Sequence, residues 1–235
     1  MMDVYWKNLN NFSEQFLRRL MRSQQEYIRQ LESILDSEKV PNIAEIQDKV
    51  ARAKEINNQV YADIKKVYAD FHEKVFETTL RTLYRTEGIA GNFDKVSYSR
   101  LEQLKRAGLQ FMENYTQDMV QLVEDQLYIA YMNGESFEEA YRRIRPYGNN
   151  KARPSVMIRD QMARISQIAV QEGYKAADNA RKYEYYWEGP DDERTTDICR
   201  DRKSRNPYTY EEMIELNPHP HIQCRHRWVR RLKEK

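Results

Sequence analysis

The chain has 235 residues, of which 40% are hydrophobic and 32% are charged, so it is long enough for one large or two small domains with an apolar core. Its 39 basic and 37 acidic residues leave a formal charge of +2, a balance that by itself implies no polyanionic partner. Two cysteines exclude a secreted disulfide scaffold, and we see neither a signal peptide nor an apolar run of about 18 residues. We therefore expect a protein of a reducing compartment without a membrane span.

The first part of the chain reads as long helices. Apolar side chains recur every three or four residues over 9–34 and again over 43–83, which places each set on one helix face. Pro41 marks the start of the second helix and Gly88 its end. At about 1.5 Å per residue that helix is roughly 65 Å long. The two helices predict an antiparallel hairpin, which needs further helices or another protein chain to bury both stripes.

Two more helices follow a loop at 88–97. The third helix is expected from residues 97–99 to the turn at 133–136. Ser136 followed by Glu139 predicts a capping box, and hence a short fourth helix.

The composition then changes near residues 145–155. Six of the seven prolines and both cysteines come after residue 145. We predict a division into an elongated helical stem, 1–150, and a C-terminal module, 151–235. The module begins with a fifth helix at about 155–179.

The rest of the module has a mixed pattern. The stretch KYEYYWEG at 182–189 alternates and is rich in aromatic residues, which is typical of a strand. Thr209 predicts the N-cap of a short helix, and CRHRWVRRL at 224–232 predicts a second strand that pairs with the first. The expected fold class is mainly α: a long antiparallel helical hairpin or bundle, followed by a small α+β module with a short two-stranded sheet.

Cysteine and histidine crowd into this module, which holds both cysteines and three of the four histidines. Zinc takes four nitrogen or sulfur ligands at tetrahedral corners, and four protein ligands leave no open position for a substrate. The spacing predicts a structural zinc site formed by Cys199, His221, Cys224 and His226. Two other interpretations stay open: the four residues are unrelated, or the two cysteines are simply neighbours in a small core.

The stretches YYWEGPDDERTTDICR and HPHIQCRHRW resemble the C-terminal module of phage Mu protein F-like minor head proteins. The matching residues are Trp187 on the strand, Asp192, Arg194 and Thr195 in the turn, Cys199, and the later His221 and Cys224. Thr196 stands where the family often has a first cysteine, and His226 where it often has the last one. Histidine keeps a zinc ligand, whereas threonine removes one. His219 lies outside the match, and we expect it to be dispensable.

The resemblance implies a virion structural protein. It implies a minor head protein that binds the portal, lies inside the head near the portal after assembly in the host cytoplasm, and assists head assembly, genome packaging or DNA delivery. The helical part would dock on the portal. In the matched turn, Asp192, Arg194 and Thr195 are expected to hold the corner between strand and loop, with the arginine fork binding carbonyls or a carboxylate.

The basic end of the chain suggests a nucleic-acid contact. Double-stranded DNA packaged in the head would meet Arg225, Arg227, Arg230 and Arg231, and binding through phosphates would be sensitive to salt.

Two other function classes remain as alternatives. One is a zinc-containing helical adaptor that binds its partners through the hairpin. The other is an enzyme, such as a nuclease or a toxin-related transferase, whose metal would need carboxylates such as Asp191, Asp192, Glu193 and Asp197. Charged turns are usually only solvated, so we expect no catalytic residues and no enzyme.

Overall fold

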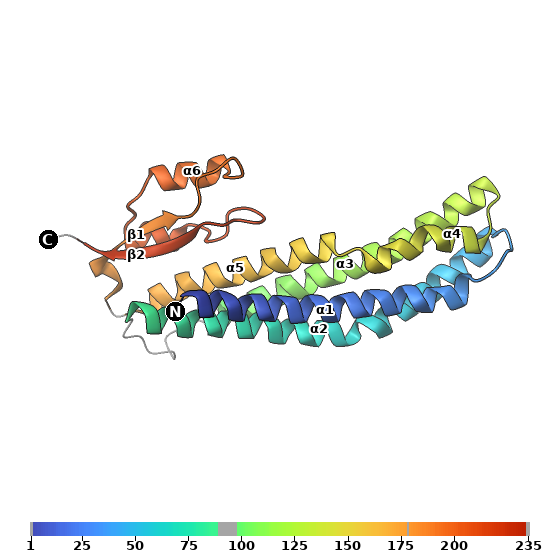
Figure 1. Cartoon of the computed structure of the whole chain (residues 1–235), viewed down its shortest axis with the longest axis horizontal. Coiled ribbons are helices and arrows are strands. Elements are labelled where there is room, and N and C mark those ends of the chain that lie inside the picture. Colours follow the sequence, from blue (N-terminus) through green and yellow to red (C-terminus); the bar gives the residue numbers. More distant parts are fainter. Residues whose placement is uncertain (1, 89–97, 178, 234–235) are drawn as a thin grey trace. The chain divides into compact units, whose positions relative to one another are not determined.

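The computed structural model describes residues 2–88, 98–177 and 179–233 (Figure 1). In chain order the longer elements are α1 (Met2–Leu35), α2 (Ile43–Glu87), α3 (Tyr98–Asn133), α4 (Phe137–Ile144), α5 (Ala152–Ala176), β1 (Tyr183–Glu188), α6 (Asp197–Ser204), α7 (Tyr210–Glu215) and β2 (Arg227–Leu232). Short 3-10 helices follow α4, at Arg145–Asn149, and precede β1, at Ala180–Lys182. The predicted fold class, long packed helices with a C-terminal two-stranded sheet, is confirmed. The loop expected at 88–97 lies, beyond Gly88, outside the described residues.

The internal contacts divide the chain into two compact units. The first unit comprises residues 1–13, 71–104 and 156–235, and the second comprises 14–70 and 105–155. Each unit is thus assembled from separate stretches of sequence, and α1, α2, α3 and α5 contribute a segment to both. The division at residue 150 that composition suggested stays a prediction.

The second unit shows how the predicted hairpin is buried. The ring of Tyr27 lies 6.2 Å from that of Tyr61, and Phe16 lies 5.2 Å from Tyr68, so α1 and α2 run antiparallel with their apolar stripes in contact. From α3, the Tyr115 hydroxyl donates a hydrogen bond of 2.5 Å to the side chain of buried Gln24. The further helices that the hairpin needs are therefore α3 and α4.

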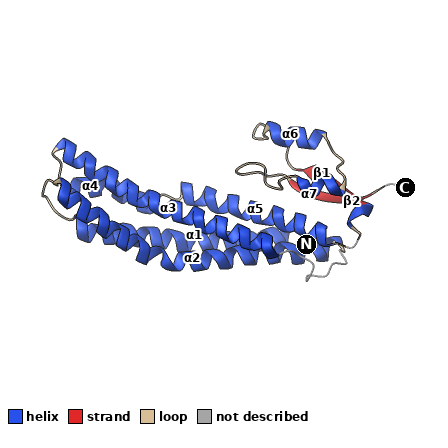
Figure 2. Ribbon diagram, turned by 180° about the vertical axis from the view of Figure 1, so that it is seen from behind, coloured by secondary structure: helices blue, strands red, loops and turns tan. Residues whose placement is uncertain are grey.

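The first unit contains the sheet. β1 and β2 are antiparallel, with Trp187 opposite Trp228 and Tyr185 opposite Arg230. Figure 2 shows these two strands in red, with α6 and α5 on opposite sides of them. Alternate residues of both strands, Tyr185, Trp187, Trp228 and Arg230, are buried. The sheet therefore has one buried face, which contributes to a core of aromatic residues and both cysteines.

Local signals placed most element ends correctly. Both capping boxes form, Ser136 with Glu139 and Thr209 with Glu212, and Gly88 has the left-handed φ of +57° expected after a helix end. The fifth helix begins at Ala152, three residues before the predicted start. Pro154 does not prevent this, because N–H groups in the first turn of a helix have no acceptor within the helix, so a proline there removes no helical hydrogen bond.

Candidate metal centre

Cys199 lies in the first turn of α6 and is 1% exposed. The turn before α6 is closed by its own side chains. Thr195 Oγ1 donates to the Pro190 carbonyl at 2.9 Å and accepts the Asp192 N–H at 3.0 Å. Asp192 Oδ1 in turn accepts the Arg194 N–H at 3.0 Å. This network fixes the direction in which α6 enters and thereby places the Cys199 thiol.

The arginine that braces this turn is Arg225 rather than Arg194. Its guanidinium donates two hydrogen bonds, of 2.8 and 2.5 Å, to the two carboxylate oxygens of Asp192. This pairing with Arg225 holds the pKa of the Asp192 carboxyl well below its usual range. The Arg194 side chain makes no hydrogen bond to any residue that the structure describes. A guanidinium therefore binds the carboxylate at this corner as expected, but it belongs to Arg225, which is distant in sequence from the turn.

Trp187 positions the cluster from β1. Its backbone is held by Asn206, whose side chain accepts the Trp187 N–H at 2.7 Å and donates to the Trp187 carbonyl at 3.2 Å. The indole is fully buried, meets Trp228 edge-on at 4.9 Å, and stacks on the His226 ring with centroids 6.0 Å apart. The Trp187 indole therefore packs against one face of the His226 ring and restricts its orientation.

The segment that carries Cys224 and His226 is anchored to α5. Gln167 donates from its side-chain amide to the His226 carbonyl at 2.5 Å and approaches the Cys224 carbonyl at 3.4 Å. All three residues are buried. Gly189 makes room for the histidine, because a Cβ at that position would lie 2.6 Å from His226 Cγ.

His221 approaches the cluster from the preceding loop. Its Nδ1 lies 2.9 Å from the Ile222 carbonyl, a contact in which nitrogen donates, and its Nε2 lies 3.1 Å from Cys199 Sγ. A hydrogen bond at Nδ1 leaves the Nε2 lone pair for a metal or a thiol, the arrangement typical of metal-binding histidines. His219 is 8% exposed, and its Nε2 lies 3.3 Å from Asp160 of α5; that it is dispensable stays a prediction.

The thiols and imidazoles fit a tetrahedral metal well. The ligand atoms of Cys199, Cys224 and His226 all lie within 4.8 Å of one another. The two sulfurs are 3.7 Å apart, and two sulfurs bound at about 2.3 Å to one tetrahedral ion lie about 3.8 Å apart. His226 Nε2 is buried without a hydrogen-bond partner among the described residues. His221 is outside this mutually close group but touches it through Cys199.

Burial also controls the protonation of the cluster. It raises the pKa of the Cys224 thiol to about 12, and the Cys199 thiol beside it adds to the shift. Burial, assisted by the charges of Lys203 and Arg225, lowers the pKa of His226. The neutral imidazole is the form that binds a metal.

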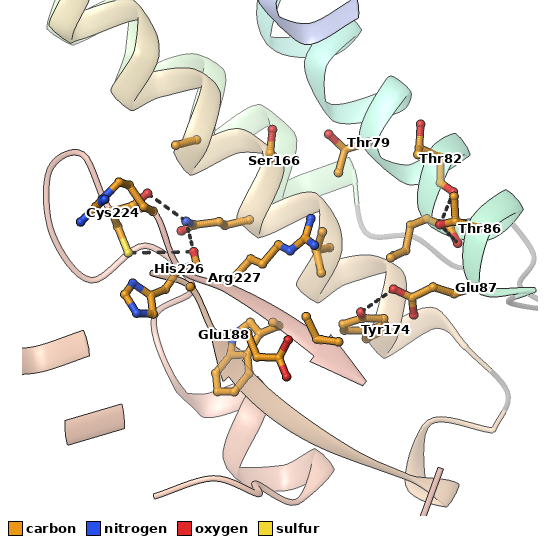
Figure 3. A pocket seen from close by; sticks show the side chains of 18 of the residues that line it. Thr79, Thr82, Thr86, Glu87, Ser166, Tyr174, Glu188, Cys224, His226 and Arg227 are labelled. Atoms are coloured by element: carbon orange, nitrogen blue, oxygen red, sulfur yellow. Dashed lines mark hydrogen bonds between the residues drawn. The ribbon is translucent and has the colours of Figure 1, made fainter. Parts of the chain in front are cut away.

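A cavity of about 620 Å³ adjoins the cluster. Figure 3 shows how it is lined by threonines of α2, by Ser166 and neighbouring residues of α5, and by the segment from Cys224 to Arg227. Ser166 Oγ and Gln167 Oε1 are buried and have no hydrogen-bond partner in the described part of the chain. The ligand-bearing segment is therefore one wall of this cavity, and any occupant would touch it.

The four arginines proposed to meet DNA are in unequal surroundings. Arg225 pairs with Asp192, Arg231 with Glu188, and Arg230 with Glu87. The Arg230 side chain is only 3% exposed. Arg227 makes no ion pair with any described residue. Three of the four thus have a carboxylate partner, and of these only Arg230 is almost fully buried, whereas the Arg231 side chain is 57% exposed.

Comparisons with known proteins assign part of the chain to a family. Residues 121–229, just under half of the chain, match the model of the family described as Phage Mu protein F like protein. This segment is a member of the phage Mu protein F-like family. Neither the curated proteins nor the solved structures yield a match.

The Mu F-like segment is longer than the two quoted stretches suggested. It begins within α3, includes α4 and α5, and ends in β2, whereas the two quoted stretches cover only 185–200 and 219–228. It contains every residue of the predicted metal set. Members of the family are minor head or head-morphogenesis proteins of phages, which are structural and generally non-enzymatic.

The carboxylates considered for an enzyme do not gather around an ion. Asp191 pairs with Lys203 and Asp197 with Arg200, and these acids are exposed. Among the described residues, the one close group suited to a metal is the Cys199, Cys224 and His226 cluster. None of the described helices has the combination of length and apolar character that crossing a bilayer requires.

Proposed function

We propose that this protein is a minor head protein that binds the portal inside the phage head and assists head assembly, genome packaging or DNA delivery. The observation that carries the proposal is the match of residues 121–229 to the Mu F-like family. The geometry of the module is compatible with a structural role, because Cys199, Cys224 and His226 are buried and their ligand atoms lie within 4.8 Å of one another.

The helical part supports binding to a protein partner. Four apolar side chains near the end of α3 are exposed by 37 to 81%: Tyr128, Ile129, Tyr131 and Met132. Aromatic residues and methionine are enriched at protein interfaces. We call these four residues the α3 patch and assign it to the portal contact.

The module is proposed to be closed by one structural zinc ion. Cys199, His221, Cys224 and His226 would hold it, and zinc would supply a cross-link between α6, the His221 turn and the segment before β2. The 3.7 Å between the sulfurs and the unpartnered Nε2 of His226 support this set. Four protein ligands leave no position for water, so the ion would be structural.

Co-expression with the portal protein of the same phage tests the portal contact. We expect the two proteins to elute together in size-exclusion chromatography. Replacing Ile129→Ser and Met132→Ser in the α3 patch should abolish co-elution. The matched control, Gln121→Ser on the same helix, should not, because Gln121 is exposed and outside the patch. A wild-type protein that never associates with the portal would favour the zinc-containing helical adaptor instead.

The DNA contact stays a separate proposal and now rests chiefly on Arg227. Removing one phosphate-binding side chain should reduce the slope of log K against log salt by about 1. Arg227→Gln should show such a change with double-stranded DNA. Truncating the chain after His226 is a poorer test, because it would remove β2 itself. Wild-type binding that does not weaken as salt rises would reject the contact.

A further inference from the structure

One side chain of α5, that of Asp160, holds the loop between His219 and Gln223 at the edge of the metal centre. Its Oδ1 accepts the backbone N–H of Gln223 at 2.6 Å and lies 3.3 Å from His219 Nε2. The Asp160 side chain is 14% exposed and that of His219 is 6% exposed. One oxygen atom thus accepts a hydrogen bond from the loop and also lies beside the buried imidazole of a second loop residue, whose Nε2 has no hydrogen-bond partner among the described residues.

The Gln223 N–H belongs to a tight turn that carries two of the proposed zinc ligands. The Cys224 N–H donates to the His221 carbonyl at 3.3 Å, which closes a turn from His221 to Cys224. Gln223 is the third residue of the turn and has a φ of +58°, the one positive φ of a non-glycine residue in the described chain. A non-glycine residue in this conformation costs free energy, so it persists only where surrounding contacts hold it in place. The residues at the two ends of the turn are two of the proposed zinc ligands.

Asp160 is part of a polar row on α5. Gln167, seven residues on, holds the carbonyls of Cys224 and His226, and Gln171 donates to the carbonyls of Met213 and Leu216 at 2.7 and 2.9 Å. Spacings of seven and four place all three side chains on one helix face. These three side chains therefore bind the backbone of the module at successive points. Asp160 is the one that contacts the turn from His221 to Cys224.

We propose that Asp160 is a positioning residue of the metal centre, which holds the turn from His221 to Cys224 in its ligand-bearing shape before metal binds. The inference rests on the proposed zinc site. His219 takes part by its buried position, with its Nε2 3.3 Å from the same carboxylate of α5. Groups that orient ligands in this way typically change metal affinity by 10- to 100-fold when removed.

The test measures zinc affinity of the full-length protein by competition with a chromogenic chelator. Asp160→Ala removes both contacts and should weaken zinc binding by about 10- to 100-fold. Asp160→Asn keeps an oxygen that can accept the Gln223 N–H, so it should recover most of the loss. The matched control is Asp63→Ala, at an exposed aspartate of α2, which should bind zinc as the wild type does. His219→Ala should fall between the wild type and Asp160→Ala.

The stability of each metal-free variant, measured in parallel, separates positioning from a general loss of fold. The inference is refuted if wild type binds zinc and Asp160→Ala binds it equally well. It is also refuted if Asp160→Asn is as weak as Asp160→Ala, because the acceptor oxygen is then irrelevant. A wild type that takes up no zinc refutes the metal centre itself, and this inference with it.

Discussion

The ion pair between Arg230 and Glu87 offers a quantitative test of how β2 is held against α2 in the first unit. Arg230 Nε donates to Glu87 Oε2 at 2.9 Å, and Nη2 donates to the Glu87 carbonyl at 3.1 Å. The guanidinium also lies 4.0 Å from the centre of the Tyr183 ring. The Tyr174 hydroxyl donates to the second carboxylate oxygen at 2.9 Å. The Glu87 side chain is therefore the counter-charge of an almost fully buried cation.

Glu87→Ala leaves that cation without its carboxylate. Removing one partner of a buried ion pair costs about 3–5 kcal/mol. Glu87 is 29% exposed, and the backbone carbonyl and the Tyr183 ring remain, so we expect a loss of about 2–3 kcal/mol in the free energy of unfolding. Arg230→Met keeps most of the packing and leaves Glu87 partly in water, so it should cost less, about 1 kcal/mol.

The double variant Glu87→Ala, Arg230→Met decides between charge and packing. Since it contains no unpaired charge, it should be more stable than the sum of the single losses predicts, by about 1–2 kcal/mol. Urea unfolding followed by tryptophan fluorescence measures this, because Trp187 and Trp228 lie in the same core. Additive losses, or a Glu87→Ala cost below about 0.5 kcal/mol, would show that the pair does not hold β2 in this way.

Three further outcomes follow from the structure. Gly189→Ala should destabilise the first unit by about 1–3 kcal/mol in urea unfolding and lower its zinc affinity, because the new Cβ would collide with the His226 ring. Wild-type stability together with wild-type zinc affinity would contradict this close approach. Burial, partly opposed by the charge of Arg153, raises the pKa of Tyr115 to about 12. Stability from this group is therefore full below its unfolded pKa of about 10 and is lost as pH rises through the folded pKa. Tyr115→Phe should show a shallower loss of unfolding free energy between these pH values, and an unchanged slope would refute the assignment. Ser136→Ala should cost about 1 kcal/mol by removing the N-cap of α4, measured by urea unfolding against the exposed control Ser33→Ala, and equal losses would argue against the cap.

The elements that sequence patterns predicted well are those specified by neighbours in the chain. Ser136 and Glu139 form their capping box within one helical turn, and the alternation of residues 183–188 reports one buried sheet face directly. The stripes of α1 and α2 likewise follow from spacing alone. In each case the signal lies in residues close in sequence, although the stripes and the strand are buried by partners elsewhere in the chain.

The polar contacts of the module lacked such a signal. Asp160 and Gln223 are 63 residues apart, and Gln167 and His226 are 59 apart. The helical spacing of Asp160, Gln167 and Gln171 does not reveal these contacts, because a polar face of a helix usually faces solvent. His219 was expected to be dispensable because it lies outside the motif residues of the resemblance. Its neighbour Asp160 is distant in sequence, so no local pattern joins the two, and whether His219 is needed stays a prediction.

The basic strand shows the same limit. Arg230 and Arg231 are adjacent and chemically identical, yet the side chain of the first is 3% exposed and that of the second 57%. Strand alternation indicates that they point to opposite faces. Alternation does not indicate that Arg230 is the one that contacts Glu87, which lies 143 residues earlier in the chain. Clustered charge alone therefore does not show which arginines are available to DNA, and that contact stays a prediction.

The metal content of freshly purified protein tests the central claim most directly. Elemental analysis should find one zinc ion per wild-type chain. It should find none in Cys224→Ala, which should also lose thermal stability in the C-terminal module. A wild-type protein that contains no metal, and takes up none from an equimolar zinc solution, would contradict the account.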